Sequence, residues 1–426
     1  MELINTVELK SNSNRVNFSN LLRTGSRLKF KERLSHFSHE IGSLRNEEQH
    51  LYFRAVESAT DRVVKVTDKN GKWREMLMFG SNNYLGLANH PLVMEKVKES
   101  VKKYGVGVAG PPLLNGYSRP MAELEKRISH LKGTEDTLIF SSGYNANLGL
   151  VTGVCTRNDI ILADEYSHAS FFDGVKLLKG KCITFKHNND RELERLLVET
   201  FAEGDIFVAV EGIYSMDGDI APLDKIVALC KKYNAGLFID DAHGTGVLGE
   251  NGEGTLEHFG LKWSDEVILG TFSKAFAVNG GFITGSAELI NYLRFMARSY
   301  MFSASLPPVT ISAVLAGLDV LEKENWRLEQ LKTNIRYLAE KLKKFGLCAE
   351  PQGGIIALGV PVYANIRKMA NQFNQAGIFL NAIEFPAVPF HKQRFRISVT
   401  ANHTTVDLDK LVATVEEIWT KNSIPF

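Results

Sequence analysis

Between about residues 77 and 305 the chain alternates short apolar runs with amphipathic stretches of helical period. Most of the apolar runs lack polar alternation, which is typical of strands that are buried on both faces. The expected strands lie in TLIFSSG, DIILADE, CITFKHN, DIFVAVEG, GLFIDDAHG, EVILGTFS and GGFITGS. This alternation of strands and helices predicts an α/β fold whose large domain has a mostly parallel sheet.

Two of the stretches between the strands place their apolar residues on one helical face. We therefore expect amphipathic helices there. The apolar residues are Met121, Leu124, Ile128 and Leu131 in the first stretch, and Leu193, Leu196, Leu197 and Phe201 in the second.

The N-terminal region, residues 1–76, has a different pattern. Residues 1 to about 30 are polar and predict a loose arm, and residues 28 to about 56 predict a helix. The segment VVKVTDKNGKW predicts a hairpin with its turn at Asn70-Gly71.

Pro307-Pro308 interrupt the central pattern, and a smaller α+β domain is expected after them. We therefore expect a large domain at residues 77–305 and a small domain at residues 306–426. The elements expected in the small domain are helices over residues 309–345, 366–376 and 406–421, and strands in GIIALGVPV and FRISVT.

Composition narrows the class of protein. The chain has 426 residues, 44% apolar and 23% charged, with a formal net charge of +1. These values suit a two-domain globular protein and give no basic excess for nucleic acid. The four cysteines form no CxxC pair, which argues against a metal site and favours a reducing compartment. The N-terminus has no apolar core and no run of about 18 apolar residues occurs, so we expect a cytoplasmic protein without a transmembrane segment.

Gly105, Gly107 and Gly110 form a GxGxxG pattern. A dinucleotide site needs a strand before this pattern and a helix after it. Here a predicted helix precedes it and Pro111-Pro112 follow, so a glycine-rich connecting loop is the better interpretation.

A lysine follows a buried apolar run in GTFSKAF. Burial would lower the pKa of Lys274 and free its amine as a nucleophile, as a Schiff-base lysine requires. The alternative for this heptapeptide alone is a lysine on a surface turn.

Asp240 ends the run FIDDAHG, and His243 follows three residues later. Open α/β sheets bind ligands at the carboxyl ends of their strands. There Asp240 could pair with a protonated pyridine nitrogen, and His243 could donate to a phenolic oxygen. A capping aspartate and a structural histidine are the alternative.

The segment SSGYNANLG predicts a Ser-Gly turn that leads into a helix. The free amides of Gly143 and Tyr144, helped by Ser142 and the helix dipole, could bind a phosphate. A capped helix start without a ligand is the alternative. In DEYSHASFFDG, His168 follows another strand end and could lie flat on an aromatic ring, although a lone histidine is more often structural.

These four signals follow one another at successive strand ends, as an anion turn, a ring histidine, a carboxylate with a histidine, and a lysine. Together they predict a pyridoxal 5'-phosphate site. With them, the chain resembles the α-oxoamine synthases, which are fold-type I enzymes of the class I/II aminotransferase group. The family includes 8-amino-7-oxononanoate synthase, glycine C-acetyltransferase, serine palmitoyltransferase and 5-aminolevulinate synthase. The matching segments, over about residues 79–403, are SNNYLGL, SSGYNANLG, DEYSHAS, EGIYSMDGDIAPL, FIDDAHGTGVLG, GTFSKAF, FSASLPP and RFRISVTANHT.

The resemblance implies a role for each matching position. Lys274 would bind the cofactor covalently and move protons, His168 would stack on the ring, and Arg396 would clamp the amino acid's carboxylate. Asn83 and Tyr84 would contact the substrate. The other implied cofactor contacts are Ser142, Gly143, Tyr144, Ser215, Asp240, His243, Thr271, Ser273 and Ser303, with Ser305 beside them.

The resemblance also implies a reaction, the decarboxylative Claisen condensation of an amino acid with an acyl thioester to give an α-aminoketone. The acyl carrier would be coenzyme A or acyl carrier protein. Members of the family are homodimers with shared active sites, so FSASLPP would reach the partner's phosphate. The alternatives are another pyridoxal-phosphate reaction, such as transamination, and a non-catalytic subunit, although Lys274 and Asp240 argue against the latter.

One loop departs from the family pattern. Many members have Gly-Ser-Arg or Gly-Thr-Arg after the glycine-rich loop, whereas this chain has Gly110-Pro111-Pro112-Leu113-Leu114-Asn115-Gly116. The Leu-Asn-Gly ending is similar to the serine palmitoyltransferase branch, and the two leucines favour a long or apolar acyl chain.

Overall fold

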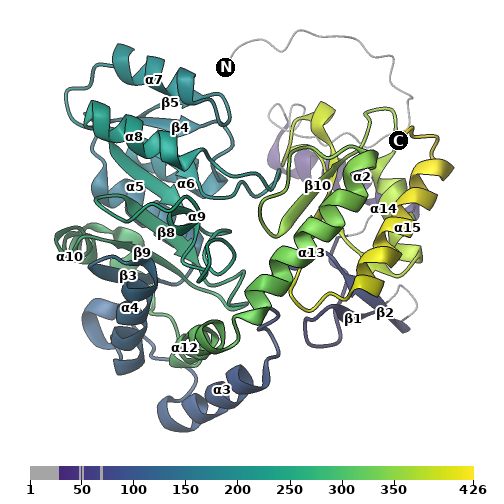
Figure 1. Ribbon diagram of the computed structural model, residues 1–426, viewed down its shortest axis with the longest axis horizontal. Coiled ribbons are helices and arrows are strands. Elements are labelled where there is room, and N and C mark those ends of the chain that lie inside the picture. Colours follow the sequence, from purple (N-terminus) through teal and green to yellow (C-terminus); the bar gives the residue numbers. More distant parts are fainter. Residues whose placement is uncertain (1–27, 48, 50–51, 68–70) are drawn as a thin grey trace.

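A seven-stranded sheet lies at the centre of the larger of two bodies in the computed structural model (Figure 1). The structure describes residues 28–47, 49, 52–67 and 71–426. The expected N-terminal arm and the turn residue Asn70 lie outside these residues. The strands, in their order across the sheet, are β3 (Asp136–Phe140), β9 (Gly281–Gly285), β8 (Val267–Thr271), β7 (Gly236–Asp240), β6 (Ile206–Glu211), β4 (Ile160–Asp164) and β5 (Lys181–Phe185).

The sheet is mostly parallel, as predicted. Neighbouring strands from β8 to β5 are parallel, whereas β9 is antiparallel to both β8 and β3. The apolar runs are continuous because both faces are covered. In β4, Ile161 and Ala163 pack into one apolar cluster while Ile160 and Leu162 pack into the cluster on the other face.

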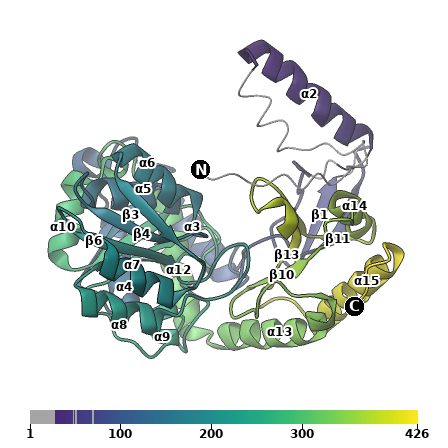
Figure 2. The same cartoon turned by 90° about the horizontal axis from the view of Figure 1, so that it is seen from above.

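Helices cover both faces of this sheet (Figures 1 and 2). One cluster contains apolar residues of α5, α6 and α10, and the other contains those of α7 and α8. The helices of this body are α3 (Pro91–Tyr104), α4 (Arg119–Lys132), α5 (Gly143–Val154), α6 (Ala169–Leu178), α7 (Asp190–Glu199), α8 (Leu223–Tyr233), α9 (Thr255–His258), α10 (Ala287–Met296), α11 (Arg298–Met301) and α12 (Pro308–Lys323).

The second body contains two small sheets. β1 (Val63–Thr67) and β2 (Trp73–Met78) form the predicted antiparallel pair, and β11 (Ile378–Phe379) joins β2 in parallel. The other sheet has the order β10 (Ile355–Gly359), β13 (Arg394–Ser398) and β12 (Asn381–Ile383), all antiparallel. The helices here are α2 (Phe30–Asn46), α13 (Trp326–Leu342), α14 (Ile366–Gln375) and α15 (Thr405–Lys421).

Two expectations need correction. Phe201 is not on the face of α7, because the helix ends at Glu199 and the ring is 87% exposed. The helical stretch at residues 309–345 is interrupted after α12, at Glu324 and Asn325, and α13 begins at Trp326. The domain boundaries stay a prediction. α12 packs against α3 and α4, so the first helix assigned to the small domain lies with helices assigned to the large one.

Among the described residues, no helix is long and apolar enough to span a bilayer.

Candidate active site

Four of the predicted side chains lie at one edge of the sheet. Ser142 follows β3, His168 follows β4, Asp240 ends β7 and Lys274 follows β8. β4, β7 and β8 run in the same direction. β9 lies between β8 and β3 and is antiparallel to both, so β3 also runs in this direction. The carboxyl ends of these strands therefore place the four segments together, as the order of the motifs predicted.

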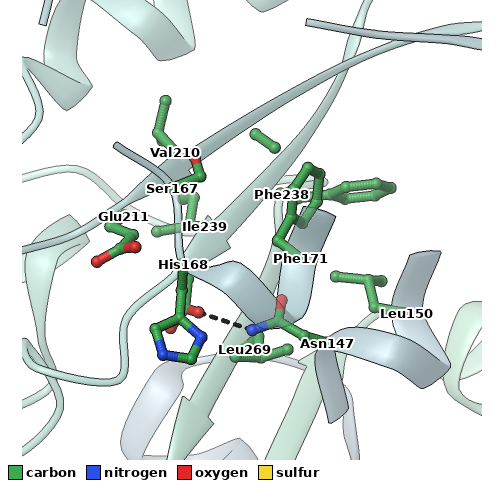
Figure 3. A pocket seen from close by; sticks show the side chains of 12 residues that line it. Asn147, Leu150, Ser167, His168, Phe171, Val210, Glu211, Phe238, Ile239 and Leu269 are labelled. Atoms are coloured by element: carbon green, nitrogen blue, oxygen red, sulfur yellow. Dashed lines mark hydrogen bonds between the residues drawn. The ribbon is translucent and has the colours of Figure 1, made fainter. Parts of the chain in front are cut away.

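Asp240 is held by hydrogen bonds on both carboxylate oxygens. Oδ2 accepts from Asn147 Nδ2 at 2.9 Å, and Oδ1 accepts from the Ala242 N–H at 3.1 Å. The same amide nitrogen of Asn147 donates to Ser170 Oγ at 3.0 Å, so both of its hydrogens are used. Figure 3 shows Asn147 and its hydrogen bond beside the ring of His168. The carboxylate is thus oriented and keeps lone pairs for a further donor.

The neighbouring Asp241 has a different environment. It is buried, and its Oδ2 accepts from Lys132 Nζ at 2.6 Å. The Thr245 hydroxyl donates to the same oxygen at 3.2 Å, and the Thr255 N–H donates to Oδ1 at 3.3 Å. The two adjacent aspartates therefore differ, because Asp241 forms a direct ion pair with Lys132 whereas Asp240 is held by neutral donors.

Burial lowers the pKa of Lys274 to about 8, although the nearby carboxylates of Asp240 and Glu211 oppose this shift. A lysine amine with such a pKa is substantially neutral in mildly alkaline solution and is then nucleophilic. This agrees with the expectation from GTFSKAF and not with a solvated surface lysine.

His168 caps the start of α6. Its Nδ1 lies 2.7 Å from Ser170 Oγ and accepts from the Ser170 N–H at 3.3 Å. Burial lowers the pKa of His168, although the charge of Asp240 opposes this shift. The ring lines a small cavity together with Asp240 and Asn147 (Figure 3), so a neutral aromatic face lies beside the oriented carboxylate.

His243 is paired with Tyr84. The Tyr84 hydroxyl lies 2.7 Å from His243 Nδ1. Burial drives the pKa of His243 well below its usual value and raises the pKa of Tyr84 to about 12. The Tyr84 hydroxyl also donates to Asn82 Oδ1 at 3.3 Å. A neutral His243 carries a single ring N–H, and its bond to Tyr84 uses Nδ1 either as the donor or as the acceptor.

The start of α5 forms an anion cradle. Ser142 Oγ caps the helix by accepting from the Asn145 N–H at 3.1 Å. The amides of Gly143 and Tyr144 are the first two of the helix, so they lack intrahelical acceptors. The Tyr144 hydroxyl bonds Asp173 on the surface, so the backbone of Tyr144 rather than its ring can serve this cradle.

The end of β8 closes the other side of this cradle. A Cβ atom at Gly143 would lie 3.0 Å from the Cβ of Thr271, so the two segments are in close contact. Thr271 Oγ1 and Ser273 Oγ are 2.9 Å apart. The Thr271 hydroxyl donates to the Gly280 carbonyl at 2.8 Å, so the Ser273 hydroxyl is the one left to donate to a ligand. This hydroxyl, the two amides at the start of α5 and the positive end of the helix suit a phosphate.

The FSASLPP segment lies near the same cradle within one chain. Ser303 Oγ is 3.4 Å from Ser141 Oγ. The Ser305 N–H donates to the carbonyl of Gly110 at 3.0 Å, which ties the segment to the glycine-rich loop. As expected, α3 precedes this loop, and no strand does; a π-helical turn follows at Pro112–Gly116.

Arg396 is buried on β13 and held in place by acceptors. Its Nε donates to the Ser215 carbonyl at 2.6 Å, and its Nη1 donates to Asn82 Oδ1 at 3.1 Å and to Ser398 Oγ at 3.2 Å. These bonds leave Nη2 for a ligand and fix the plane of the guanidinium. Ser215 contributes to this arrangement through its backbone carbonyl.

Asn83 is used by its own segment. Its Nδ2 donates to the Thr60 carbonyl at 3.4 Å, and its Oδ1 accepts from the Ala88 N–H at 3.2 Å. The structure brings the preceding residue, Asn82, to Arg396 instead. A substrate contact by Asn83 therefore stays a prediction.

Sequence reasoning missed Asn82, Asn147 and Glu211. Asn147 lies on the buried face of α5 among apolar residues, and an amide at a buried position of a helix is a signal that could have been noticed. Glu211 ends the apolar run of β6 and faces Asp240 across the register, which the strand-end rule could also have found.

The residues present fit pyridoxal 5'-phosphate. An oriented carboxylate suits a pyridinium, a neutral imidazole beside it suits the ring, and the cradle at α5 suits the phosphate. A further sign is the absence of space for side chains at the cradle: a Cβ at Gly281 would lie 2.5 Å from the Gly143 nitrogen.

Comparisons with known proteins agree with this site. The family model described as aminotransferase class I and II matches residues 74–415. Serine palmitoyltransferase of Sphingobacterium spiritivorum is 36% identical over 400 residues, covering 94% of this chain and 99% of that protein. The 8-amino-7-oxononanoate synthase of Lysinibacillus sphaericus is 41% identical over 350 residues, covering 82% of this chain and 90% of that protein.

Solved structures give the same result. A high-resolution structure of SPT with PLP internal aldimine has a TM-score of 0.86 at 28% identity and covers 93% of this chain and 100% of that chain. The structure of serine palmitoyltransferase of Sphingomonas wittichii has a TM-score of 0.85 at 29% identity. The match covers 92% of this chain and 98% of that chain. The chain therefore belongs to the aminotransferase class I and II family, and within it to the α-oxoamine synthases, whose cofactor is pyridoxal 5'-phosphate.

Proposed function

We propose that this protein is a pyridoxal-phosphate-dependent C-acyltransferase that condenses an amino acid with an acyl thioester, with loss of carbon dioxide, to give an α-aminoketone. The observation that supports this most is the pairing of a lysine of lowered pKa, Lys274, with the oriented carboxylate of Asp240 at one sheet edge. The relatives named serine palmitoyltransferase and 8-amino-7-oxononanoate synthase support condensation over transamination.

When bound, pyridoxal 5'-phosphate supplies an aldehyde for Lys274 and an electron-poor ring that stabilises negative charge at the substrate's α-carbon. Asp240, whose carboxylate is oriented by Asn147, would keep the ring nitrogen protonated. His168 would cover one face of the ring, and His243 would contact the phenolic oxygen. The amides of Gly143 and Tyr144 would hold the phosphate.

The remaining site residues have supporting roles in this proposal. Ser142, Thr271 and Ser273 would hold the phosphate together with Ser303 of the partner subunit, and Ser215 would lie beside the cofactor. Arg396 would bind the amino acid's carboxylate through Nη2, the guanidinium nitrogen that its other hydrogen bonds leave. The Lys274 amine would hold and move the proton at the substrate's α-carbon.

The acyl donor is an acyl thioester of coenzyme A or acyl carrier protein, and the enzyme resembles either serine palmitoyltransferase or 8-amino-7-oxononanoate synthase in its substrates. Leu113 and Leu114 are 37% and 81% exposed in the loop that departs from the family pattern. Their exposure supports a long or apolar acyl chain.

We further propose a cytoplasmic homodimer with shared active sites. Apolar side chains are exposed on the loop after α3, on α10 and after α11, with Val106 77%, Phe295 56% and Phe302 69% exposed. Figure 2 shows α2 projecting from the second body, and Phe30 on this helix is 64% exposed. A second copy would cover such surfaces. Light scattering of the purified holoenzyme should give twice the monomer mass.

Product analysis tests the proposed reaction. Purified holoenzyme is incubated with pooled amino acids and acyl thioesters of different chain length, and the products are identified by mass spectrometry. We expect an α-aminoketone together with free thiol and carbon dioxide in equal amounts. Stoichiometric oxo acid and pyridoxamine phosphate, without thiol release, would show a transaminase instead.

A further inference from the structure

His187 lies directly after β5, and two carboxylates enclose its ring. Nδ1 is 3.1 Å and 3.2 Å from the two oxygens of Asp164, and Nε2 is 2.8 Å from Asp219 Oδ2. A neutral imidazole has a single N–H and would turn a bare nitrogen toward one of these carboxylates. Only the imidazolium donates to both, so the geometry requires a positive charge at His187.

The surroundings favour this charged form. The ring of His187 stacks on Tyr166 at 4.4 Å and meets the edge of Tyr214 at 4.4 Å. Burial alone would lower the pKa of His187, but the hydrogen bonds to Asp164 and Asp219 raise it to about 9.

Other charged groups lie beyond these neighbours. Lys392, on the segment before β13, contacts the Tyr166 hydroxyl, and the Glu211 carboxyl lies near Tyr214. Neither separates the ring from its two carboxylates.

Asp219 belongs to a tight hairpin over residues 212–221. Ile213 and Ile220 form an antiparallel bridge. The Tyr214 N–H donates to the Asp219 carbonyl at 2.9 Å, and the Gly218 N–H donates to the Tyr214 carbonyl at 2.8 Å. The side chain of Asp219 therefore fixes the base of this hairpin to the large sheet through His187. Asn188 adds neutral hydrogen bonds to Asp219 Oδ2 at 3.0 Å and to the Ile220 carbonyl at 3.1 Å, so His187 supplies the charged part of this attachment.

The tip of the 212–221 hairpin meets β13 in the second body. Arg396 donates to the Ser215 carbonyl at 2.6 Å, and Arg394 donates to the Met216 carbonyl at 3.2 Å and pairs with Asp217. The hairpin thus connects a charged anchor at the sheet edge with the arginine proposed to bind the substrate carboxylate.

We propose that His187, as an imidazolium, is a positioning residue that holds the 212–221 hairpin and thereby sets the orientation of Arg396 for the amino acid's carboxylate. This rests on the proposed function for the identity of the ligand. His187 touches neither cofactor nor substrate, so its loss affects amino-acid binding more than the turnover of bound substrate.

His187→Gln, compared with Lys186→Ala, tests the proposal. Lys186 is the exposed neighbour and pairs with Glu165 at 3.1 Å on the surface. Two measurements are made on the holoenzymes, hydrogen exchange of peptides from residues 212–221 and amino-acid affinity from the change in cofactor absorbance. We expect faster exchange and about tenfold weaker amino-acid binding in His187→Gln, equivalent to one charge-assisted hydrogen bond. The rate at saturating amino acid should change less, and Lys186→Ala should behave as wild type.

A pH series on the wild-type holoenzyme needs no variant to fold. The imidazolium is lost as pH rises through about 9. We therefore expect two quantities to rise in this pH range. They are the hydrogen-exchange rate of residues 212–221, corrected for the intrinsic pH dependence of exchange, and the dissociation constant for the amino acid. His187→Gln should lack this step. The proposal is overturned if His187→Gln exchanges faster in the hairpin but binds the amino acid as tightly as wild type. It is also overturned if the wild-type enzyme shows no rise of exchange and dissociation constant near pH 9. If no thioester is turned over but these results hold, the proposed reaction fails and the positioning role stands.

Discussion

Asn147 donates a hydrogen bond to Asp240 at 2.9 Å from the second turn of α5, whose first turn offers the free amides of Gly143 and Tyr144. In the proposed function one helix would serve both ends of the cofactor, because its start would receive the phosphate and its next turn would orient the carboxylate for the ring nitrogen. This role would explain why a polar residue is buried on the apolar face of the helix.

Removing this amide should weaken cofactor binding. In Asn147→Ala, Asp240 loses the donor that orients it, which costs on the order of 1 kcal/mol, and we expect a dissociation constant for pyridoxal 5'-phosphate about tenfold higher. Fluorescence titration of the apoenzyme measures it. Thr152→Ala, on the same helix, removes a hydroxyl that bonds only the Leu148 carbonyl, and it should bind as wild type. Equal affinity in both variants would refute the orienting role.

Asp240 and Glu211 face each other in neighbouring strands but should respond differently to amide substitution. Burial raises the pKa of Glu211 well above its usual value, which favours its neutral form, so we expect Glu211→Gln to change cofactor affinity little. Asp240→Asn removes the charge that pairs with the pyridinium, and we expect a loss of about 10- to 100-fold in affinity. The same fluorescence titration compares the cofactor affinities of the two variants. A larger loss of affinity in Glu211→Gln than in Asp240→Asn would contradict the assignment of Asp240 as the partner of the ring nitrogen.

The guanidinium of Arg396 should act on substrate binding. Arg396→Lys keeps the charge but loses the planar guanidinium and its bond to the Ser215 carbonyl. We expect the KM for the amino acid to rise about 10- to 100-fold, with a smaller change in kcat and none in the KM for the thioester. Steady-state kinetics with each substrate varied in turn would show it. A selective rise in the thioester KM would place Arg396 at the other substrate.

The buried pair of Lys132 and Asp241 should act on stability. Lys132→Met leaves the Asp241 charge buried without its partner, which should lower the free energy of unfolding by about 3–5 kcal/mol. Chemical denaturation of the holoenzyme measures this. Lys132→Met with Asp241→Asn should recover part of the loss, because the unpaired charge is gone. A double variant less stable than the single one would contradict this explanation.

The sequence predicted the sheet and the edge where the site lies. This worked because strands covered on both faces read as continuous apolar runs, and because polar residues such as Asp240 and Lys274 end or follow these runs. The helix that includes Leu193 and Leu197 was also predicted, but its end was not: Thr200 leaves the helix and Phe201 points to solvent.

Contacts between distant segments could not be predicted in this way. Asn82 and Asn83 look alike in SNNYLGL, and only the packing of β13 against this segment decides that Asn82 meets Arg396. The two carboxylates on His187 come from a strand end and from a hairpin 55 residues apart in sequence, Asp164 and Asp219. Such partners are defined by the fold and by no local pattern.

Borohydride reduction of the cofactor-saturated enzyme, followed by peptide mapping, tests the central claim most directly. We expect one pyridoxyl group per chain, on Nζ of Lys274 in the peptide that contains GTFSKAF, and none in Lys274→Ala. A pyridoxyl group on another lysine, or none on a protein that is saturated with cofactor, would contradict it.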